Sequence, residues 1–176
     1  VARDPAMIVY LDAATNRRGS PNENLAREVM ELFVLGQGHY GERDVKEAAR
    51  AFTGFSLDPD TLAFRYRPGF HDGGSKSVLG VTGPLAGDDV LDILLAQPAA
   101  AEFIAAKLWR EFVSPEPDPV RVSAIARRFR ESRYDIAVAV RETLLQPEVV
   151  DGRAESALVK SPAELAIGLV RQTGGR

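Results

Sequence analysis

Two groups of polar side chains in the 176-residue sequence have the residue types that acid–base chemistry requires. His71 and Asp72 are adjacent in a loop bounded by glycines, and His71 is one of only two histidines. Because imidazole titrates near neutral pH, the two could form an acid–base pair. They could also bind a metal ion through nitrogen and carboxylate oxygen, but the H-x-x-x-H spacing of many metal sites is absent, so we assign no metal ligands. In the structural alternative, Asp72 caps a turn and His71 hydrogen-bonds to the loop backbone.

The second group lies on a predicted helix, where polar residues follow the i, i+3, i+4, i+7 spacing that places them in one stripe. Its members are Asn24, Arg27, Glu28 and Glu31. This stripe is either a solvated face with modest ion pairs or the wall of a cleft. If it forms an active site with the loop, then His71 and Asp72 must approach Arg27 or Glu28 to within about 3 Å, or one bridging water.

Composition excludes several classes of protein. Lys and Arg number 22 against 25 Asp and Glu, a net charge of -3 that does not favour a nucleic-acid partner. Arginines near residues 121–133 have few aromatic neighbours, so we interpret them as a solvated helix face. The absence of cysteine excludes disulfides and thiol chemistry, and no apolar run is long enough to span a membrane. Because the chain begins at Val1 without Met, we expect a fragment or a processed product.

Most of the chain has helical periodicity, and its first half predicts two helices in a hairpin. The first begins with Ser20 as N-cap and Glu23 completing a capping box, and it ends at Gly36. Its predicted apolar face is Leu25, Val29, Leu32 and Phe33. The second runs from about 42 to 53, and its predicted apolar face is Val45, Ala48, Ala49 and Phe52.

Between about 55 and 80 the pattern changes to alternation, which predicts a small antiparallel β-hairpin or a three-stranded sheet. Helical periodicity resumes near residue 88, giving a mainly α, multi-helix fold. The next helices should bury Phe103, Ile104, Leu108 and Phe112 over about 98–113, Val122, Ile125, Ala126 and Phe129 after Asp118, and Ile136, Val140 and Leu144 after Asp135. Ser161 and Glu164 should cap the last helix.

The proline-rich segment 114–119 is the predicted internal boundary. It predicts a first part, 1–113, with the helical hairpin, the β insert and the following helices. It also predicts C-terminal helices over 120–176, packed on the same domain.

Residues 22–28, NENLARE, followed by Glu31-Leu32 and Leu35-Gly36, resemble the signature of a large bacterial family called domain of unknown function 1800. Further matches cover nearly the whole chain in order: Asp44-Val45, residues 48–54, residues 70–72, Lys76, Leu79-Gly80, residues 103–108 and residues 160–162. In one departure, Gly41 stands where a threonine or serine usually caps the second helix.

The resemblance implies the central part of a longer, mainly helical protein that is often exported, in the periplasm or outside the cell. It also implies a protein partner, a sulfatase-like protein encoded nearby. It supplies no reaction and no cofactor.

We therefore hold two hypotheses. The first is a helical module that acts by binding or assembly with a protein partner. Its candidate binding residues are Asn22, Asn24, Glu31, Arg50 and Lys76. The second is a hydrolase-like enzyme with Arg27, Glu28, His71 and Asp72 as catalytic residues. The two differ in whether the helix stripe and the His71 loop share one cleft.

Overall fold

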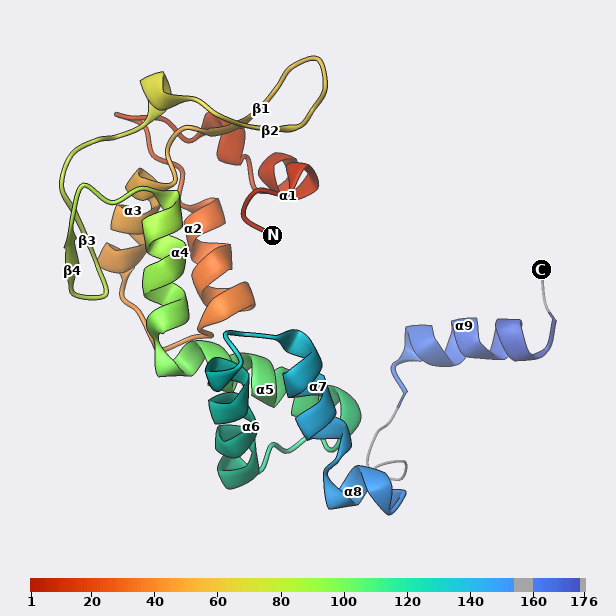
Figure 1. The fold of residues 1–176 in the computed structure, drawn as a ribbon. Helices are drawn as coiled ribbons and strands as arrows, with labels where there is room; N and C mark the ends of the chain where they lie inside the picture. The colour runs from red at the N-terminus through yellow and green to blue at the C-terminus, as the bar shows by residue number, and fades with distance from the viewer. Residues whose placement is uncertain (154–159, 175–176) are drawn as a thin grey trace. The chain divides into compact units, whose positions relative to one another are not determined.

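The computed structural model describes residues 1–153 and 160–174. Of these residues 57% are helical, so the predicted mainly α fold is confirmed. The chain divides into two compact units, Val1–Phe103 and Ile104–Arg176, which are described separately (Figure 1). The domain boundary at 114–119 stays a prediction, and within the predicted 120–176 part residues 154–159 and 175–176 lie outside the described residues.

The first unit combines short helices with four short strands. In chain order they are α1 Pro5–Tyr10, the 3₁₀-helix η1 Ala13–Thr15, α2 Asn24–Glu28, the π-helix η2 Val29–Val34, α3 Glu42–Ala51, β1 Phe55–Leu57, β2 Phe64–Tyr66, the 3₁₀-helix η3 Pro68–Phe70, β3 Lys76–Val78, β4 Val81–Gly83 and α4 Gly87–Ala96. Helices α2 and α4 pack against α3, and β3 lies along the same helix (Figure 1).

The predicted start of the first helix of the hairpin is wrong. Ser20 does not cap it; instead, Ser20 and Arg17 form an isolated antiparallel bridge. The helix begins at Asn24, whose backbone N–H donates to Oδ1 of Asn22 at 2.9 Å. The four residues Ser-Pro-Asn-Glu offer two side chains suited to capping, and the later one, Asn22, supplies the oxygen.

The apolar face of this helix is also partly wrong, because η2 is a π-helix. The Leu35 N–H donates to the carbonyl of Met30, five residues earlier, at 2.8 Å. Such a wide turn changes the angular position of the residues that follow it. Leu32 consequently remains 49% exposed, whereas Met30 is fully buried beside the predicted Leu25 and Val29.

Helix α3 follows its prediction closely. Val45, Ala48, Ala49 and Phe52 are all fully buried. The helix ends before Gly54, which has φ +91°, a conformation that L side chains rarely adopt. A Cβ at Gly54 would lie 2.8 Å from the Arg67 carbonyl oxygen, so this glycine also permits the close approach of the chain after β2.

The β insert consists of two antiparallel hairpins of two strands each, β1–β2 and β3–β4. Phe55 pairs with Tyr66 in the first, and Val78 pairs with Val81 in the second. The second hairpin adds β4, just beyond the predicted 55–80 range. Leu79 and Gly80 have φ +47° and +83° and form its two-residue turn, the left-handed geometry that suits a tight hairpin.

The helix α5, Pro98–Phe112, begins in the first unit and continues into the second, which also contains α6 Pro119–Glu131, α7 Ile136–Leu144, α8 Pro147–Val150 and α9 Pro162–Gln172. The predicted caps Asp118, Asp135 and Ser161 are confirmed, and so is the buried face of α6. None of the helices in the described ranges has both the length and the apolar character to cross a membrane.

Two predicted helix faces in this region are displaced. In α5 none of the predicted residues is buried and Phe112 is exposed, whereas the buried residues are Ala100, Ala101, Ala105 and Trp109. In α7, Ala139 and Thr143 are buried, whereas Ile136 and Leu144 are exposed. Apart from Trp109, small residues mark the buried faces of both helices, and a pattern that weights large apolar side chains does not detect them.

Candidate functional site

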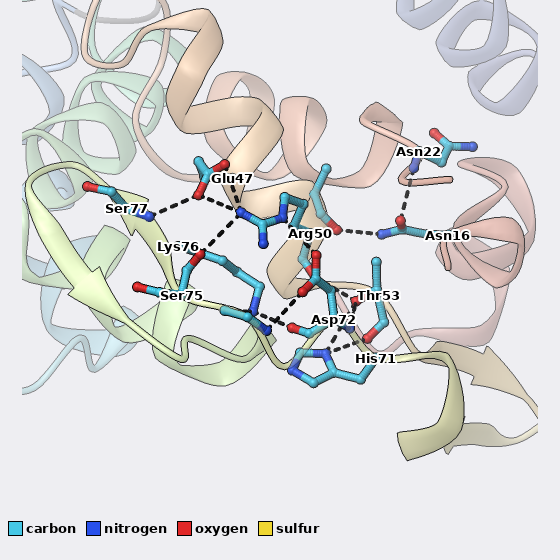
Figure 2. Close-up of polar contacts among 12 residues, drawn as sticks. Asn16, Asn22, Glu47, Arg50, Thr53, His71, Asp72, Ser75, Lys76 and Ser77 are labelled. Carbon is cyan, nitrogen blue, oxygen red and sulfur yellow. Dashed lines mark hydrogen bonds and ion pairs between the residues drawn. The ribbon is translucent and has the colours of Figure 1, made fainter. Parts of the chain in front are cut away.

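Polar side chains along one side of α3 and just after its C-terminal end form hydrogen bonds with the backbone of residues 71–79. This segment contains the loop before β3 and the strand itself, and we call it the 71–79 loop. The residues that bond to it are three apart in the sequence and therefore lie along one side of the helix. Figure 2 shows the loop lying along three of these side chains, Glu47, Arg50 and Thr53. The bonds are Leu79 N–H to Asp44 Oδ1 (2.8 Å), Ser77 N–H to Glu47 Oε2 (3.1 Å), Arg50 Nη1 to the Ser75 carbonyl (3.2 Å) and Asp72 N–H to Thr53 Oγ1 (2.8 Å).

Asp72 is anchored by an ion pair as well as by its backbone. Its Oδ2 lies 2.8 Å from Nε of Arg50, and its Oδ1 accepts the Gly74 N–H at 2.9 Å. The Arg50 guanidinium also contacts Glu47 at 3.0 Å. The hydrogen bond from Arg50 lowers the pKa of the Asp72 carboxyl to about 2, so this group is ionised at neutral pH. The same bonds raise the pKa of Arg50.

Lys76, a predicted binding residue, points inward and is only 1% exposed. Its ammonium donates to the backbone carbonyl oxygens of Asp72 and, at 2.9 Å, Gly74 (Figure 2). Burial lowers the pKa of this amine. The charge of Lys76 therefore holds the 72–76 turn together from inside.

His71 is oriented by Thr53. Its Nδ1 lies 3.0 Å from the Thr53 carbonyl oxygen and 3.3 Å from the Thr53 hydroxyl. That hydroxyl donates to the Arg50 carbonyl at 2.6 Å, so we assign the Nδ1 proton to the bond with the Thr53 carbonyl. The neutral ring then carries its lone pair on Nε2, and the imidazole packs beside the Tyr66 ring at a centroid distance of 5.9 Å.

The other predicted catalytic residues belong to a different polar network. Arg27 binds Glu23 at 3.0 Å and Glu42 at 2.8 Å, and the hydrogen bonds that it donates to Glu42 raise the pKa of its guanidinium. Glu31 accepts from Gln37 at 2.6 Å and from Tyr40 at 3.1 Å, bonds that lower the pKa of Glu31.

These two networks lie at opposite ends of α3. Arg27 contacts Glu42 at the start of the helix, and Asp72 contacts Arg50, eight residues further on. Eight residues of α-helix span about 12 Å. Among the described contacts, no hydrogen bond or ion pair joins Arg27 or Glu28 to the His71 loop. The structure thus brings His71 and Asp72 together with Arg50 and Lys76, and the four-residue catalytic set stays a prediction.

The two asparagine candidates have different positions. Asn22 accepts the Asn24 N–H at the start of α2 and donates from Nδ2 to the Thr15 hydroxyl at 3.2 Å. Asn24 is exposed at the first position of α2. Neither contacts the loop through a hydrogen bond that the structure describes.

Sequence reasoning missed the residues that connect this region. Buried Asn16 donates to the Ala49 carbonyl at 2.8 Å and accepts the Asn22 N–H at 2.9 Å (Figure 2). No local signal marks Asn16, which lies in a short loop. Thr53 and Asp44 fall inside stretches that carry the family resemblance, and that signal could have identified them. Within the described ranges, no three His, Asp or Glu side chains are grouped to hold a metal ion.

The family is shown by direct comparison. A model of the family described as protein of unknown function (DUF1800) matches residues 1–175, which is essentially the whole chain. The chain therefore belongs to this family. The search of curated proteins and the search of solved structures gave no match.

Proposed function

We propose that this chain is a binding module, which presents the 71–79 loop as a rigid surface to a protein partner. One observation carries the proposal: side chains along α3 fix the backbone of this loop from Asp72 to Leu79. A loop held in one conformation loses little entropy when it binds, and this favours affinity.

The chemistry of the loop residues supports binding over catalysis. Asp72 is fully ionised at neutral pH and paired with Arg50, so it is a poor proton donor or acceptor. Lys76 is buried on backbone carbonyls. Both side chains stabilise the loop, and neither is presented to a substrate.

The surface beside the loop has the composition of a protein contact. Gly73, Gly74 and Ser75 are exposed, and Phe70 precedes the loop. The Arg17 guanidinium lies 4.5 Å from the centre of the Phe70 ring. Aromatic and arginine side chains are enriched in protein interfaces. From the family resemblance, we further propose that the parent protein is bacterial and exported, and that its partner is the sulfatase-like protein encoded nearby.

The proposal is tested by measuring the affinity between the two proteins by calorimetry. Ser75→Glu places a charge on the exposed loop without removing a side-chain bond, and it should weaken binding at least 10-fold. Arg50→Gln should also weaken binding, because it frees the loop. Arg43→Gln changes an exposed arginine of the same helix and should leave the affinity within about 2-fold. Absence of wild-type binding would refute the partner, and unchanged affinity in Ser75→Glu would refute the surface.

His71 favours a second candidate, a hydrolase-like enzyme. Its Nδ1 proton is committed to Thr53, which leaves Nε2 free to accept a proton in the manner of a general base. Hydrolysis of activated esters and phosphate esters, compared between the wild type and His71→Gln, tests this function. Activity that is lost in His71→Gln while the fold is retained would support the enzyme, and no activity in the wild type would count against it.

A further inference from the structure

A cavity of about 200 Å³ lies in the first unit, apart from the α3–loop bonds described above. One side of it is formed by three aromatic rings of the β1–β2 hairpin, Phe55, Phe64 and Tyr66, and the rest by Arg3 and the start of α4. The Phe55 ring meets Phe64 edge to face at 5.1 Å and Tyr66 at 6.4 Å. The hollow is thus lined by aromatic rings that fix one another's orientation.

The start of α4 holds these rings in place. A Cβ at Gly87 would lie 2.6 Å from Phe55 Cζ and 2.8 Å from Phe52 Cδ1, so the helix approaches the rings as closely as its backbone allows. Phe55 is buried, yet Tyr66 remains 40% exposed. The cavity is therefore preformed and open to solvent on the tyrosine side.

An ion pair between Arg3 and Asp88 lies at the opening of this cavity. The Arg3 guanidinium contacts the Asp88 carboxylate and lies 5.4 Å from the centre of the Phe64 ring. Both charged side chains are more than half exposed, so a ligand can reach them. The site thus offers a cation and an anion side by side above an aromatic hollow.

We infer that this cavity binds a free aromatic amino acid, with its ring between Phe64 and Tyr66, its carboxylate on Arg3 and its ammonium on Asp88. A cavity of about 150 Å³ is known to hold benzene, so the volume here fits one ring with a short stem. A ligand with one charge would break the Arg3–Asp88 pair and face a like charge. A zwitterion replaces one ion pair with two, and it alone matches both partners.

Calorimetric titration with L-phenylalanine tests the inference, with three probes that each lack one feature. Phenylpropionate lacks the ammonium, phenethylamine lacks the carboxylate and L-alanine lacks the ring. We expect saturable binding of phenylalanine and at least 10-fold weaker binding of each of the other three. The inference would be overturned if binding did not saturate by about 10 mM phenylalanine, a concentration that corresponds to a binding free energy of only about 3 kcal/mol. Equal binding of phenylpropionate would also overturn it.

Two variants locate the site. Ala86→Leu fills the cavity from its wall without disturbing a hydrogen bond of the side chain, and Arg3→Met removes the charge while keeping a stem of similar length. Both should reduce the affinity at least 10-fold with the thermal unfolding midpoint retained. Ala63→Leu and Arg18→Met, at exposed positions in the same unit, are the matched controls and should bind as the wild type does. Unchanged binding in Ala86→Leu would place the ligand elsewhere.

Discussion

The guanidinium of Arg50 and the carboxylate of Asp72 lie 2.8 Å apart, although 22 residues separate them in the sequence. Arg50 belongs to α3, and Asp72 belongs to the loop that leads into β3. The pair is partly buried, with 29% and 18% of the two side chains exposed. It therefore joins a helix to a loop at a point where water screens the interaction only in part.

Asp72→Asn should lower the free energy of unfolding by about 1–3 kcal/mol, because hydrogen bonds to a charged group are stronger than those to a neutral amide. Chemical denaturation measures this loss. Asp60→Asn, at an exposed position, is the control and should stay within about 0.5 kcal/mol of the wild type. Equal stability of the two variants would contradict the role of the pair.

The same pair predicts a pH dependence of stability. The Asp72 pKa falls from 3.8 to about 2 on folding, so its ionised form stabilises the fold above about pH 4. This stabilisation is lost as the pH falls from about 4 to about 2, and it amounts to about 2 kcal/mol. The stability difference between the wild type and Asp72→Asn, measured in denaturant at about pH 6 and about pH 2, should shrink accordingly. If the stability difference between the wild type and Asp72→Asn did not change with pH, this prediction would be refuted.

The π-helix predicts an unequal effect of two substitutions in η2. Met30→Ala should lower stability by about 2–5 kcal/mol, because it leaves a cavity at a fully buried position. Leu32→Ala should change stability by no more than about 0.5 kcal/mol, since Leu32 is 49% exposed. Denaturant titrations of both variants decide the matter, and a larger loss at Leu32 would mean that the helix is a regular α-helix.

The hydrogen bond between Asn22 and Asn24 at the start of α2 predicts different stability effects for two substitutions. Asn22→Ala should lower stability by about 1 kcal/mol, because Oδ1 of Asn22 accepts the Asn24 N–H at the start of α2. Ser20→Ala should have almost no effect, since Ser20 bonds to Arg17 through its backbone. Thermal unfolding of the two variants side by side is sufficient. A larger stability loss in Ser20→Ala than in Asn22→Ala would instead support Ser20 as the residue that caps the helix.

Lys76→Ala should lower stability by about 2–5 kcal/mol, since it removes a buried side chain and leaves two backbone carbonyls without their donor. Lys46→Ala, on the exposed side of α3, provides the control. Denaturation curves for both variants test the prediction, and similar small losses would show that the ammonium does not hold the turn.

Local signals predicted much of the fold. Asp118, Asp135 and Ser161 cap their helices as expected, because a cap depends on residues within one turn of the helix. The π turn at Leu35 depends on packing around the whole helix, and no single residue type signals it. The sequence thus predicted where helices form better than which side of each helix is buried.

The candidate site was less predictable, because its contacts are distant in sequence. The resemblance singled out Arg50, Lys76, His71 and Asp72, and the structure places these four residues in one region. Their pairing with each other, instead of with Arg27, depends on how the 71–79 loop returns to α3. Helical spacing predicts neighbours along one helix and says nothing about such a return.

The bonds between α3 and β3 also affect how the protein meets other chains. The N–H groups of Ser77 and Leu79 point away from β4 and end on carboxylates of α3, so this side of the hairpin has no open edge. An incoming strand cannot extend the sheet there, which removes a common route to aggregation. In this hairpin, another strand could pair only with the outer side of β4, where Val81 is exposed and Gly83 has no side chain to block the approach.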